Sequence, residues 1–345
     1  MPQPPSSFAS LGNGLLNCAA AASAITAAAA GIVAAACPAL DAINQIAPFA
    51  FLGALGVLAT TLVIWRRRLD RHPASLAAAG FAVLLFQFML AQEAIAGLLN
   101  RWIAPAATAD TITVVTLNLW QGGPWEARAV DYLIATDADF VVLQETGFLY
   151  RPGLQRLRQA YPFVIESIAA PYAQVALLSR RAPETVNMLA GAAWSLAAAH
   201  QPSRRLRWTE ATFVAHGTPL RLVGLHARRD GGPAATAAEL DAISRFLAER
   251  ADPSTLIVAG DFNMTSWTHT LHRFGHTARA RRATRQIATF PAPARGAGVW
   301  PFFAIFAIDH QFYGARWRPV AVRRGPDVGS DHYPVAVTYA PVAAP

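Results

Sequence analysis

The sequence of 345 residues contains no lysine, so all 29 of its lysine-or-arginine positions are arginines. Arginine suits bidentate recognition of phosphate, but the complete absence of lysine is better explained by genome base composition than by chemistry. The formal net charge is +8. A basic chain is compatible with a phosphate-bearing or polyanionic substrate and with a membrane surface, so the charge does not choose between them.

Cysteine is also scarce. The two cysteines, Cys18 and Cys37, lie at opposite ends of one hydrophobic run near the N-terminus. This placement argues against a disulfide framework and against a cysteine-based zinc site. Because no cysteine follows residue 37, the rest of the chain tolerates either an oxidising or a reducing compartment.

Charged residues make up only 14% of the chain, whereas hydrophobic residues make up 54%. The shortage of charge is concentrated before residue 110, and a run such as 48–65 carries no charge at all. Such a run is long enough to cross a bilayer core of roughly 30 Å. We therefore predict that residues 1–102 form a membrane anchor with spans at 14–36, 48–65 and 75–98. Alanine dominates the first span and inserts weakly, which leaves a choice between two and three transmembrane helices.

Four arginines lie in the short loop between the second and third predicted spans: Arg66, Arg67, Arg68 and Arg71. Loops rich in arginine stay on the cytoplasmic side, so the third span leads outward. We predict an inner or plasma membrane location, a lipid bilayer as partner, and an extracytoplasmic position for the rest of the protein. The alternative is a pair of buried core helices, which an arginine loop between two long apolar runs disfavours.

Residues 103–111 form a linker of small residues, and residues 112–345 form a second domain in which strand and helix patterns alternate. Branched apolar runs predict strands at 112–119, 139–144, 174–179 and 255–260, a hairpin within 207–227, and three strands after residue 307. A helix is predicted over 236–250, with Thr236 and Glu239 in capping-box register. Mixed strands and helices with hairpins favour an α/β sandwich over a purely parallel barrel.

Polar side chains of catalytic type stand where the apolar runs of this domain end. Each one alone has a plain structural explanation, such as a turn cap or a solvated strand end. Together they predict a functional site, because sheet-built active sites collect at strand ends. These residues are Asn118, Glu145, His226, Asp261, Asn263, Asp309, Asp331 and His332.

In chain order these residues stand in the motifs LNLW, LQET, GLH, GDFN, IDH and SDHYP. The set resembles the endonuclease/exonuclease/phosphatase superfamily, with the deoxyribonuclease-I-like fold, over roughly residues 112–340. The resemblance implies a four-layer α/β sandwich of two packed mixed sheets flanked by helices, here preceded by two or three transmembrane helices. It also implies a divalent-metal-dependent hydrolase of phosphodiesters or phosphomonoesters, with its site at one edge of the sheets.

The resemblance also assigns metal ligands. Asn118, Glu145 and Asp331 match the metal-associated positions of the family, and such hard oxygen ligands suit Mg²⁺, with Mn²⁺ as the alternative. One position departs from the pattern, since Trp120 stands where many relatives carry a second asparagine. This departure puts in question any second-metal or sugar contact made there.

Five further residues take catalytic roles by the same resemblance. His332 matches the catalytic histidine and Asp309 the carboxylate that orients it. Asp261 and Asn263 match the pair that positions the attacking water and the phosphate, and His226 matches a second histidine that assists as a general acid or phosphate donor. The residues themselves agree: an Asp and an Asn two apart at a strand end project on one side, with Phe262 turned into the protein.

Three hypotheses about activity follow. The leading one is hydrolysis of a phosphodiester, in a nucleic acid or in a phospholipid headgroup, by attack of water. The alternatives are a phosphomonoesterase and a catalytically silent binding or scaffold module of the same fold. The presence of every matching catalytic residue speaks against the silent module.

Two other patterns invite functional interpretations. His269, His272 and His276 would share one face of a helix, as zinc ligands do, but no Cys, Asp or Glu in that run completes a closed zinc shell. The basic stretches 204–208 and 278–285 could hold a nucleic-acid backbone, a solvated face or anionic lipid. Given the predicted anchor, we favour proximity to lipid.

Overall fold

The structure is a computed structural model. It describes residues 110–120, 126–147, 152–166, 173–186, 208–285, 287–293, 304 and 306–342, together with 32–47 and isolated positions before residue 81. The chain divides into two compact units. The first comprises Met1–Ala96 with Trp267–Thr270, and the second comprises Gly97–Ser266 with Leu271–Pro345.

The described part of the first unit contains a 3₁₀ turn, η1 (Pro38–Leu40), followed by the short helix α2 (Asp41–Asn44). The buried Asp41 carboxylate accepts hydrogen bonds from the backbone N–H groups of His269 and Thr270, at 3.0 and 2.8 Å. The three predicted membrane spans lie largely outside the described residues. Among the described residues, no helix combines the length and the apolar character needed to cross a membrane.

The second unit is built on two six-stranded sheets. Sheet A has the order β11-β12-β1-β2-β4-β3, in which only the β1–β2 pair is parallel. Its strands are β1 (Ile112–Asn118), β2 (Phe140–Gly147), β3 (Phe163–Glu166), β4 (Ala173–Ser179), β11 (Trp317–Arg324) and β12 (Val335–Pro341).

Sheet B has the order β5-β6-β7-β8-β10-β9, and its one parallel pair is β7–β8. Its strands are β5 (Thr185–Val186), β6 (Trp208–Ala215), β7 (Thr218–His226), β8 (Leu256–Asp261), β9 (Arg281–Arg282) and β10 (Asp309–Tyr313). Each sheet therefore places one parallel pair of strands near its middle, with the carboxyl ends of the pair at one edge.

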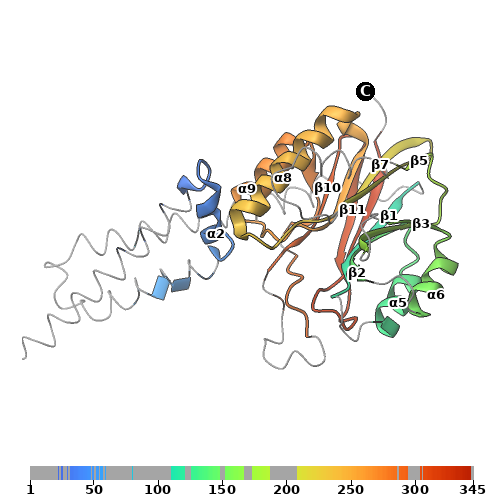
Figure 1. The fold of residues 1–345 in the computed structure, drawn as a ribbon, viewed down its shortest axis with the longest axis horizontal. Helices are drawn as coiled ribbons and strands as arrows, with labels where there is room; N and C mark the ends of the chain where they lie inside the picture. Colours follow the sequence, from blue (N-terminus) through green and yellow to red (C-terminus); the bar gives the residue numbers. More distant parts are fainter. Residues whose placement is uncertain are drawn as a thin grey trace, which may run out of the picture. The chain divides into compact units, whose positions relative to one another are not determined.

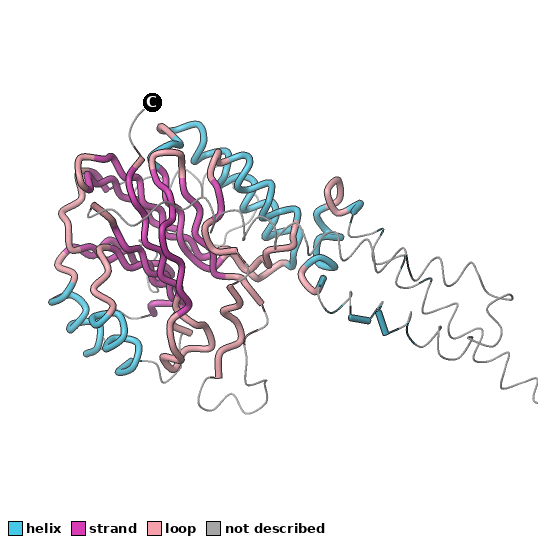
Figure 2. The backbone as a smooth tube through the Cα atoms, turned by 180° about the vertical axis from the view of Figure 1, so that it is seen from behind, coloured by secondary structure: helices cyan, strands magenta, loops and turns pink. Residues whose placement is uncertain are grey.

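Helices cover the outer faces of both sheets, as Figures 1 and 2 show. Apolar side chains of α5 (Glu126–Ala135) and α6 (Pro152–Ala160) pack on sheet A. Those of α8 (Gly232–Arg250) and α9 (His269–Thr277) pack on sheet B, and the turn η3 (Pro253–Thr255) leads into β8. The predicted α/β sandwich of two mixed sheets flanked by helices is confirmed.

A third apolar layer lies between the two sheets. Phe140 of sheet A meets Phe213 of sheet B edge to face, with ring centroids 4.8 Å apart. Gly224 in β7 permits close approach of the sheets, because a Cβ there would lie 2.9 Å from methyl carbons of Val142 and Val175. This tight packing fixes the edges of the two sheets relative to each other.

The predicted strands and the predicted hairpin within 207–227 are confirmed, and its turn falls at His216 and Gly217. The predicted capping box is wrong. Helix α8 begins at Gly232, four residues before Thr236, with Gly231 in a left-handed conformation (φ 90°) as its N-cap. The Thr236 hydroxyl instead donates to the backbone oxygen of Arg228 at 2.8 Å. Glu239 accepts from the Arg228 N–H at 2.6 Å. Both side chains therefore hold the segment after β7 rather than the helix start.

Candidate active site

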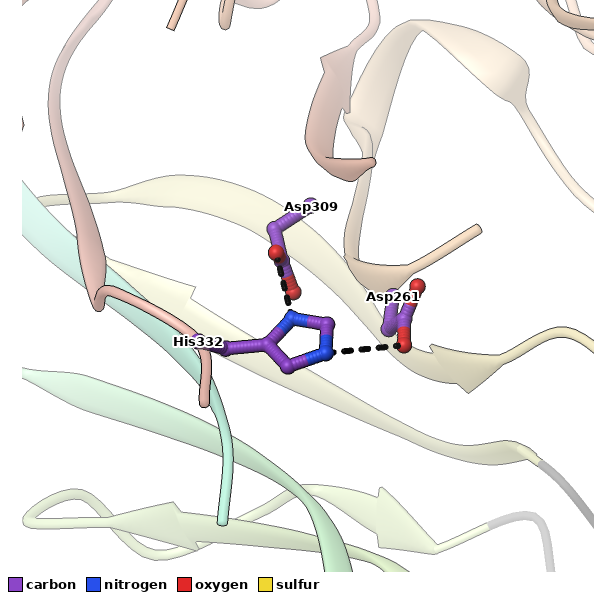
Figure 3. Close-up of side chains that lie close together, drawn as sticks. All are labelled: Asp261, Asp309 and His332. Carbon is purple, nitrogen blue, oxygen red and sulfur yellow. Dashed lines mark hydrogen bonds and ion pairs between the residues drawn. The ribbon is translucent and has the colours of Figure 1, made fainter. Parts of the chain in front are cut away.

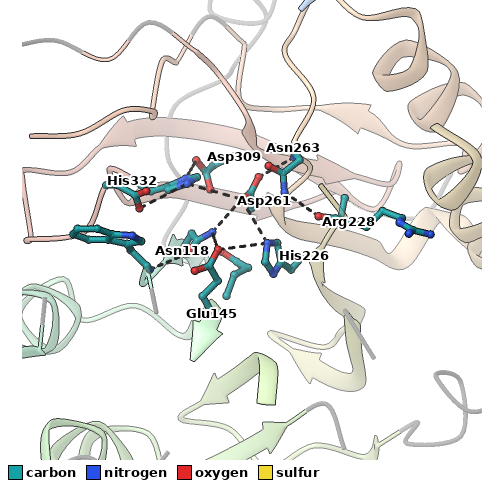
Figure 4. A network of polar contacts seen from close by, with 12 residues as sticks. Asn118, Glu145, His226, Arg228, Asp261, Asn263, Asp309 and His332 are labelled. Carbon is teal, nitrogen blue, oxygen red and sulfur yellow. Dashed lines mark hydrogen bonds and ion pairs between the residues drawn. The ribbon is translucent and has the colours of Figure 1, made fainter. Parts of the chain in front are cut away.

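The polar strand ends of both sheets meet at one edge of the sandwich (Figure 4). Asn118 ends β1, and Glu145 lies in the neighbouring parallel strand β2. In sheet B, His226 and Asp261 end the parallel strands β7 and β8 and are paired in register. Asp309 begins β10 directly opposite Asp261. Carboxyl ends of parallel strands collect functional side chains in this way, so the convergence follows from the topology.

Asp309, His332 and Asp261 form a buried series of polar contacts (Figure 3). His332 Nδ1 lies 2.8 Å from Asp309 Oδ2, a hydrogen bond that orients the imidazole. The other ring nitrogen, Nε2, faces Asp261 Oδ2 at 3.9 Å. That separation is too long for a direct hydrogen bond. The three side chains are 1%, 6% and 2% exposed for Asp309, His332 and Asp261.

Burial and charge shift the protonation of this group. Burial, followed by the charge of Asp309, raises the pKa of Asp261 to about 7, although His332 opposes the shift. Burial alone would lower the pKa of His332, but the charge and hydrogen bond of Asp309 and the charge of Asp261 raise it to about 10. His332 is therefore cationic at neutral pH, whereas Asp261 is close to its midpoint. A proton donor and a proton acceptor stand on either side of the same small volume.

Asn118 connects the two sheets. Its Nδ2 donates to Glu145 Oε1 and to Asp261 Oδ2, each at 3.1 Å, while its Oδ1 accepts from the Trp120 N–H at 2.9 Å. His226 Nε2 lies 3.8 Å from Glu145 Oε1 and 3.9 Å from Asp261 Oδ2. Asp261 Oδ2 is thus faced by the Nε2 atoms of both active-site histidines.

The backbone is strained at several of these positions. Trp120, Glu145 and Asn263 have φ angles of 53°, 53° and 50°, in the left-handed region that side chains other than glycine rarely adopt. Such residues concentrate at functional sites, where surrounding structure holds them. Gly260 has a related role, since a Cβ there would lie 1.8 Å from the Leu225 oxygen. Glycine is required for β8 to bring Asp261 this close to β7.

Asn263 differs in geometry from the sequence prediction. Strand β8 ends at Asp261, and the left-handed turn that follows lets the Asn263 N–H donate to Asp261 Oδ1 at 2.8 Å. Asn263 Nδ2 donates to the Ala227 oxygen at 2.8 Å, so the side chain joins the ends of β8 and β7. Phe262 is fully buried as predicted, and packs against Phe274 at 5.1 Å between ring centroids.

Glu145 and Asp331 offer oxygen atoms for a divalent cation. Asp331 Oδ1 is buried and forms no hydrogen bond within the described part of the chain. Burial raises the pKa of Asp331, His332 opposes this, and the charge of Glu145 raises it again. Mg²⁺ or Mn²⁺ fits this pair of carboxylates, because they repel each other and one of them has an unsatisfied oxygen. The Asn118 Oδ1 keeps a second lone pair for the same ion.

A second group of ligand-type atoms is less suited to a cation. Asp261, Asp309 and His332 each bring one such atom to within 4.8 Å of the others. His332 Nδ1 is already bonded to Asp309, and its raised pKa keeps the imidazole protonated. A cation here would have to displace that proton, so the carboxylates of Glu145 and Asp331 form the better site.

Two supporting residues were missed by the sequence analysis. The Ser330 hydroxyl donates to the Asn118 oxygen at 2.6 Å and accepts from the His332 N–H at 3.1 Å. Ser330 stands in the SDHYP motif, so the motif offered a signal for it. Thr289 Oγ1 donates to Asp309 Oδ2 at 2.5 Å. Thr289 is 20 residues from Asp309 and follows no apolar run, so no sequence pattern marks it.

The structure also describes parts of the other two sequence patterns. Helix α9 is formed, with His272 and His276 exposed, and among the described residues the α9 histidines join no group of three metal-ligand side chains. In the basic stretch 278–285, Arg282 is 4% exposed and its guanidinium lies 3.4 Å from the Ser266 oxygen. The stretch is therefore not a uniform solvated face. Residues 204–207 lie outside the described residues.

Residues 115–332 match the model of the Endonuclease/Exonuclease/phosphatase family. The chain belongs to that family. Members of the endonuclease/exonuclease/phosphatase family are hydrolases that act on phosphate esters. The match ends at His332 and includes every site residue named above.

Solved structures agree on the fold. An endonuclease/exonuclease/phosphatase from Bacteroides vulgatus is 17% identical with a TM-score of 0.53, covering 67% of this chain and 99% of that one. A family member from Beutenbergia cavernae DSM 12333 is 19% identical with a TM-score of 0.50, covering 68% and 73%. The protein SmcL is 18% identical with a TM-score of 0.50, covering 67% and 99%. A search of curated proteins finds no significant match.

Proposed function

We propose that this protein hydrolyses a phosphodiester with the help of a divalent cation, by attack of water on phosphorus. The observation that carries the proposal is the buried arrangement of Asp309, His332 and Asp261. It combines a 2.8 Å hydrogen bond that orients the imidazole with a 3.9 Å gap between His332 Nε2 and Asp261 Oδ2. A phosphate beside these two atoms would meet a hydrogen-bond donor in His332 and a proton acceptor in Asp261.

Each residue has a defined part in this reaction. Ionised Asp261 accepts the proton of the attacking water, as a general base with a pKa near the working pH does. Protonated His332 donates its Nε2 hydrogen to a phosphoryl oxygen as negative charge builds there. His226 Nε2, on the other side of Asp261, is placed to protonate the leaving oxygen. The bond from phosphorus to the leaving oxygen breaks as the bond from water forms.

Glu145 and Asp331, with the Asn118 amide oxygen, would hold the cation. A bound Mg²⁺ or Mn²⁺ supplies charge that stabilises the phosphoryl oxygens during the displacement. Glu145 also accepts a hydrogen bond from Asn118 Nδ2, so its carboxylate is oriented before any ion binds. We place the substrate phosphate between this carboxylate pair and His332.

The substrate class stays open between a nucleic acid and a phospholipid headgroup. The arginine-rich composition and the predicted anchor support contact with anionic lipid, and the same charge would attract a nucleic-acid backbone. A phosphomonoesterase and a catalytically silent scaffold are the alternatives. Against the scaffold stands the complete set of acid, base and orienting groups in contact at one sheet edge.

The test is turnover by the purified full chain, with Mg²⁺ or with EDTA, beside the His332→Ala variant. The substrates are bis(p-nitrophenyl) phosphate, p-nitrophenyl phosphate, plasmid DNA and sphingomyelin vesicles. We expect metal-dependent hydrolysis of a diester that falls by about 10²- to 10⁴-fold in the variant. Preference for p-nitrophenyl phosphate would identify a monoesterase. A folded, metal-binding protein that turns over none of the four would contradict the proposal.

We also propose that residues 1–102 anchor the protein in the inner or plasma membrane with the catalytic domain outside the cytoplasm. The support is the pair of long apolar runs on either side of an arginine loop. The test introduces a single cysteine at Ala106 in a chain whose Cys18 and Cys37 are changed to serine. We expect labelling by a membrane-impermeant reagent from outside. Labelling from the cytoplasmic side alone would rule this orientation out.

A further inference from the structure

The Asp309 carboxylate is held by two donors on a single oxygen. Asp309 Oδ2 accepts from His332 Nδ1 at 2.8 Å and from the Thr289 hydroxyl at 2.5 Å. Its other oxygen, Oδ1, is buried and forms no hydrogen bond with any described residue. A carboxylate with one free oxygen could rotate and offer that oxygen to the imidazole instead. The Thr289 hydroxyl opposes the rotation, because it would lose its own acceptor.

Thr289 is itself fixed on both sides. Its side chain is fully buried, and its backbone N–H donates to the Phe306 oxygen at 2.8 Å. Its backbone oxygen accepts from the N–H of Tyr333, the residue after the catalytic histidine, at 2.9 Å. Thr289 therefore contacts Asp309 through its side chain, and through its backbone it contacts Tyr333, the neighbour of His332.

The next residues of the same segment continue this contact. The ring of Phe290 lies over His332 with centroids 5.0 Å apart, and the Ala292 N–H donates to the Asp331 oxygen at 2.6 Å. Arg324 of β11 covers the other end, since its guanidinium lies 4.4 Å from the Tyr333 ring centroid and donates to the Ala288 oxygen at 3.0 Å. The segment 288–292 is thus bonded to the loop that carries His332 at several successive points.

We infer that Thr289 is a positioning residue for His332 that acts through Asp309. Its hydroxyl holds the Asp309 carboxylate in the one orientation that keeps His332 Nδ1 protonated and Nε2 directed at Asp261. Partners of this outer kind commonly decide the orientation and tautomer of a working histidine. The inference rests on the proposed hydrolysis for its consequence in rate, but the orientation of His332 can be measured without turnover.

The first test compares Thr289→Val with Thr289→Ser in the full chain. Valine keeps the branched shape and removes the hydroxyl, whereas serine keeps the hydroxyl. We expect Thr289→Val to lower kcat by about 10- to 100-fold, as the loss of an outer partner of a catalytic group does, with little change in KM. Thr289→Ser should restore most of kcat. A rise in KM with kcat unchanged in Thr289→Val would overturn the inference. So would a kcat in Thr289→Ser that stays as low as in Thr289→Val.

The matched control is Thr284→Val. Thr284 is another fully buried threonine beside β10, and its hydroxyl accepts from the Gln311 N–H at 3.0 Å and lies 3.3 Å from His310 Nδ1. It makes no described contact with Asp309 or His332. Both valine variants should lose similar stability in thermal unfolding, yet only Thr289→Val should lose kcat. An equal loss of kcat in both would assign Thr289 a merely structural role.

Two further measurements separate this inference from the proposed function. In metal-free protein labelled with ¹⁵N-histidine, the Nδ1–H resonance of His332 should shift or broaden in Thr289→Val and stay in place in Thr289→Ser and Thr284→Val. An unchanged resonance in Thr289→Val would overturn the inference, even if the wild type proves inactive. If turnover is observed, the effect of Thr289→Val should vanish in an Asp309→Asn background, and additive effects would contradict action through Asp309.

Discussion

The two halves of the candidate active site differ in how firmly their side chains are held. In the dyad half, which comprises the Asp309–His332 dyad together with Asp261, no side chain is more than 6% exposed and direct hydrogen bonds fix the groups. In the cation half, which comprises Glu145 and Asp331, the side chains are 29% and 25% exposed. Asp331 Oδ1 there forms no hydrogen bond with described residues.

This difference separates two kinds of catalytic work. Groups that move protons must be oriented before substrate arrives, and burial with fixed partners provides that orientation while shifting their pKa values. Groups that hold a cation need access to solvent and unsatisfied oxygens, because the ion enters with water attached. Changes in the dyad half should therefore reduce turnover at every metal concentration. Changes in the cation half should be compensated by a higher metal concentration.

The largest expected effect comes from Asp261→Asn in the dyad half. The variant loses the proton acceptor, so kcat should fall by about 10²- to 10⁴-fold at any metal concentration. The thermal stability of the metal-free variant, measured in EDTA, should not fall together with kcat. The folded-state pKa of Asp261 is about 7 against an ordinary 3.8, so ionisation of Asp261 opposes folding increasingly as pH rises from 3.8 through 7. At pH 8 the variant should therefore unfold at a higher temperature than the wild type. Near-normal turnover by the variant would contradict the role of Asp261 as proton acceptor.

Glu145→Gln should affect the cation half alone. The loss of one carboxylate charge should raise the Mg²⁺ concentration needed for half-maximal rate by about 10- to 100-fold. High metal should then restore much of kcat, which it should not do for Asp261→Asn. Initial rates over a Mg²⁺ titration distinguish the two variants. An unchanged metal midpoint in Glu145→Gln would remove Glu145 from the cation site.

The fold was predictable because its signals are local. The apolar runs that became β1, β2, β4, β7 and β8 are continuous and end in polar residues, and these two features alone locate both sheets and the site edge. Short elements such as β3 and α6 were not predicted, because neither has a long enough pattern. The predicted start of α8 was wrong because Thr236 and Glu239 bond to Arg228, in the segment after β7. That tertiary contact overrides the local capping pattern.

The gathering of the candidate site residues at one edge was predictable from sequence, but their contacts were not. All eight predicted residues reach one edge, but sequence could not reveal that Asn118 Nδ2 bonds two carboxylates or that Asn263 turns into a left-handed conformation to reach Ala227. These details depend on pairs of residues more than 25 positions apart. Thr289 is the extreme case, because nothing around it in the chain marks its contact with Asp309.

A smaller effect is expected from pH, and it again distinguishes the halves. In the proposed reaction Asp261 acts in its ionised form, so kcat should fall as pH drops through about 7, by roughly tenfold per unit below the midpoint. His332 stays protonated up to about 10, so its own loss of charge should lower the rate only in alkali. Rate profiles at two saturating Mg²⁺ concentrations test this. An acid limb that moves with metal concentration would belong to the cation half instead.

The smallest effect is expected outside both halves, on helix α9. His272 and His276 stand one helical turn apart and exposed, a spacing that zinc sites often use, but among the described residues no third ligand joins them. Substitutions at exposed positions usually change stability by less than about 0.5 kcal/mol. The double variant His272→Ala and His276→Ala should therefore keep wild-type turnover, and neither protein should retain zinc in elemental analysis. Zinc that copurifies with the wild type and is lost from the variant would place a second metal centre on α9, separate from the paired carboxylates of Glu145 and Asp331.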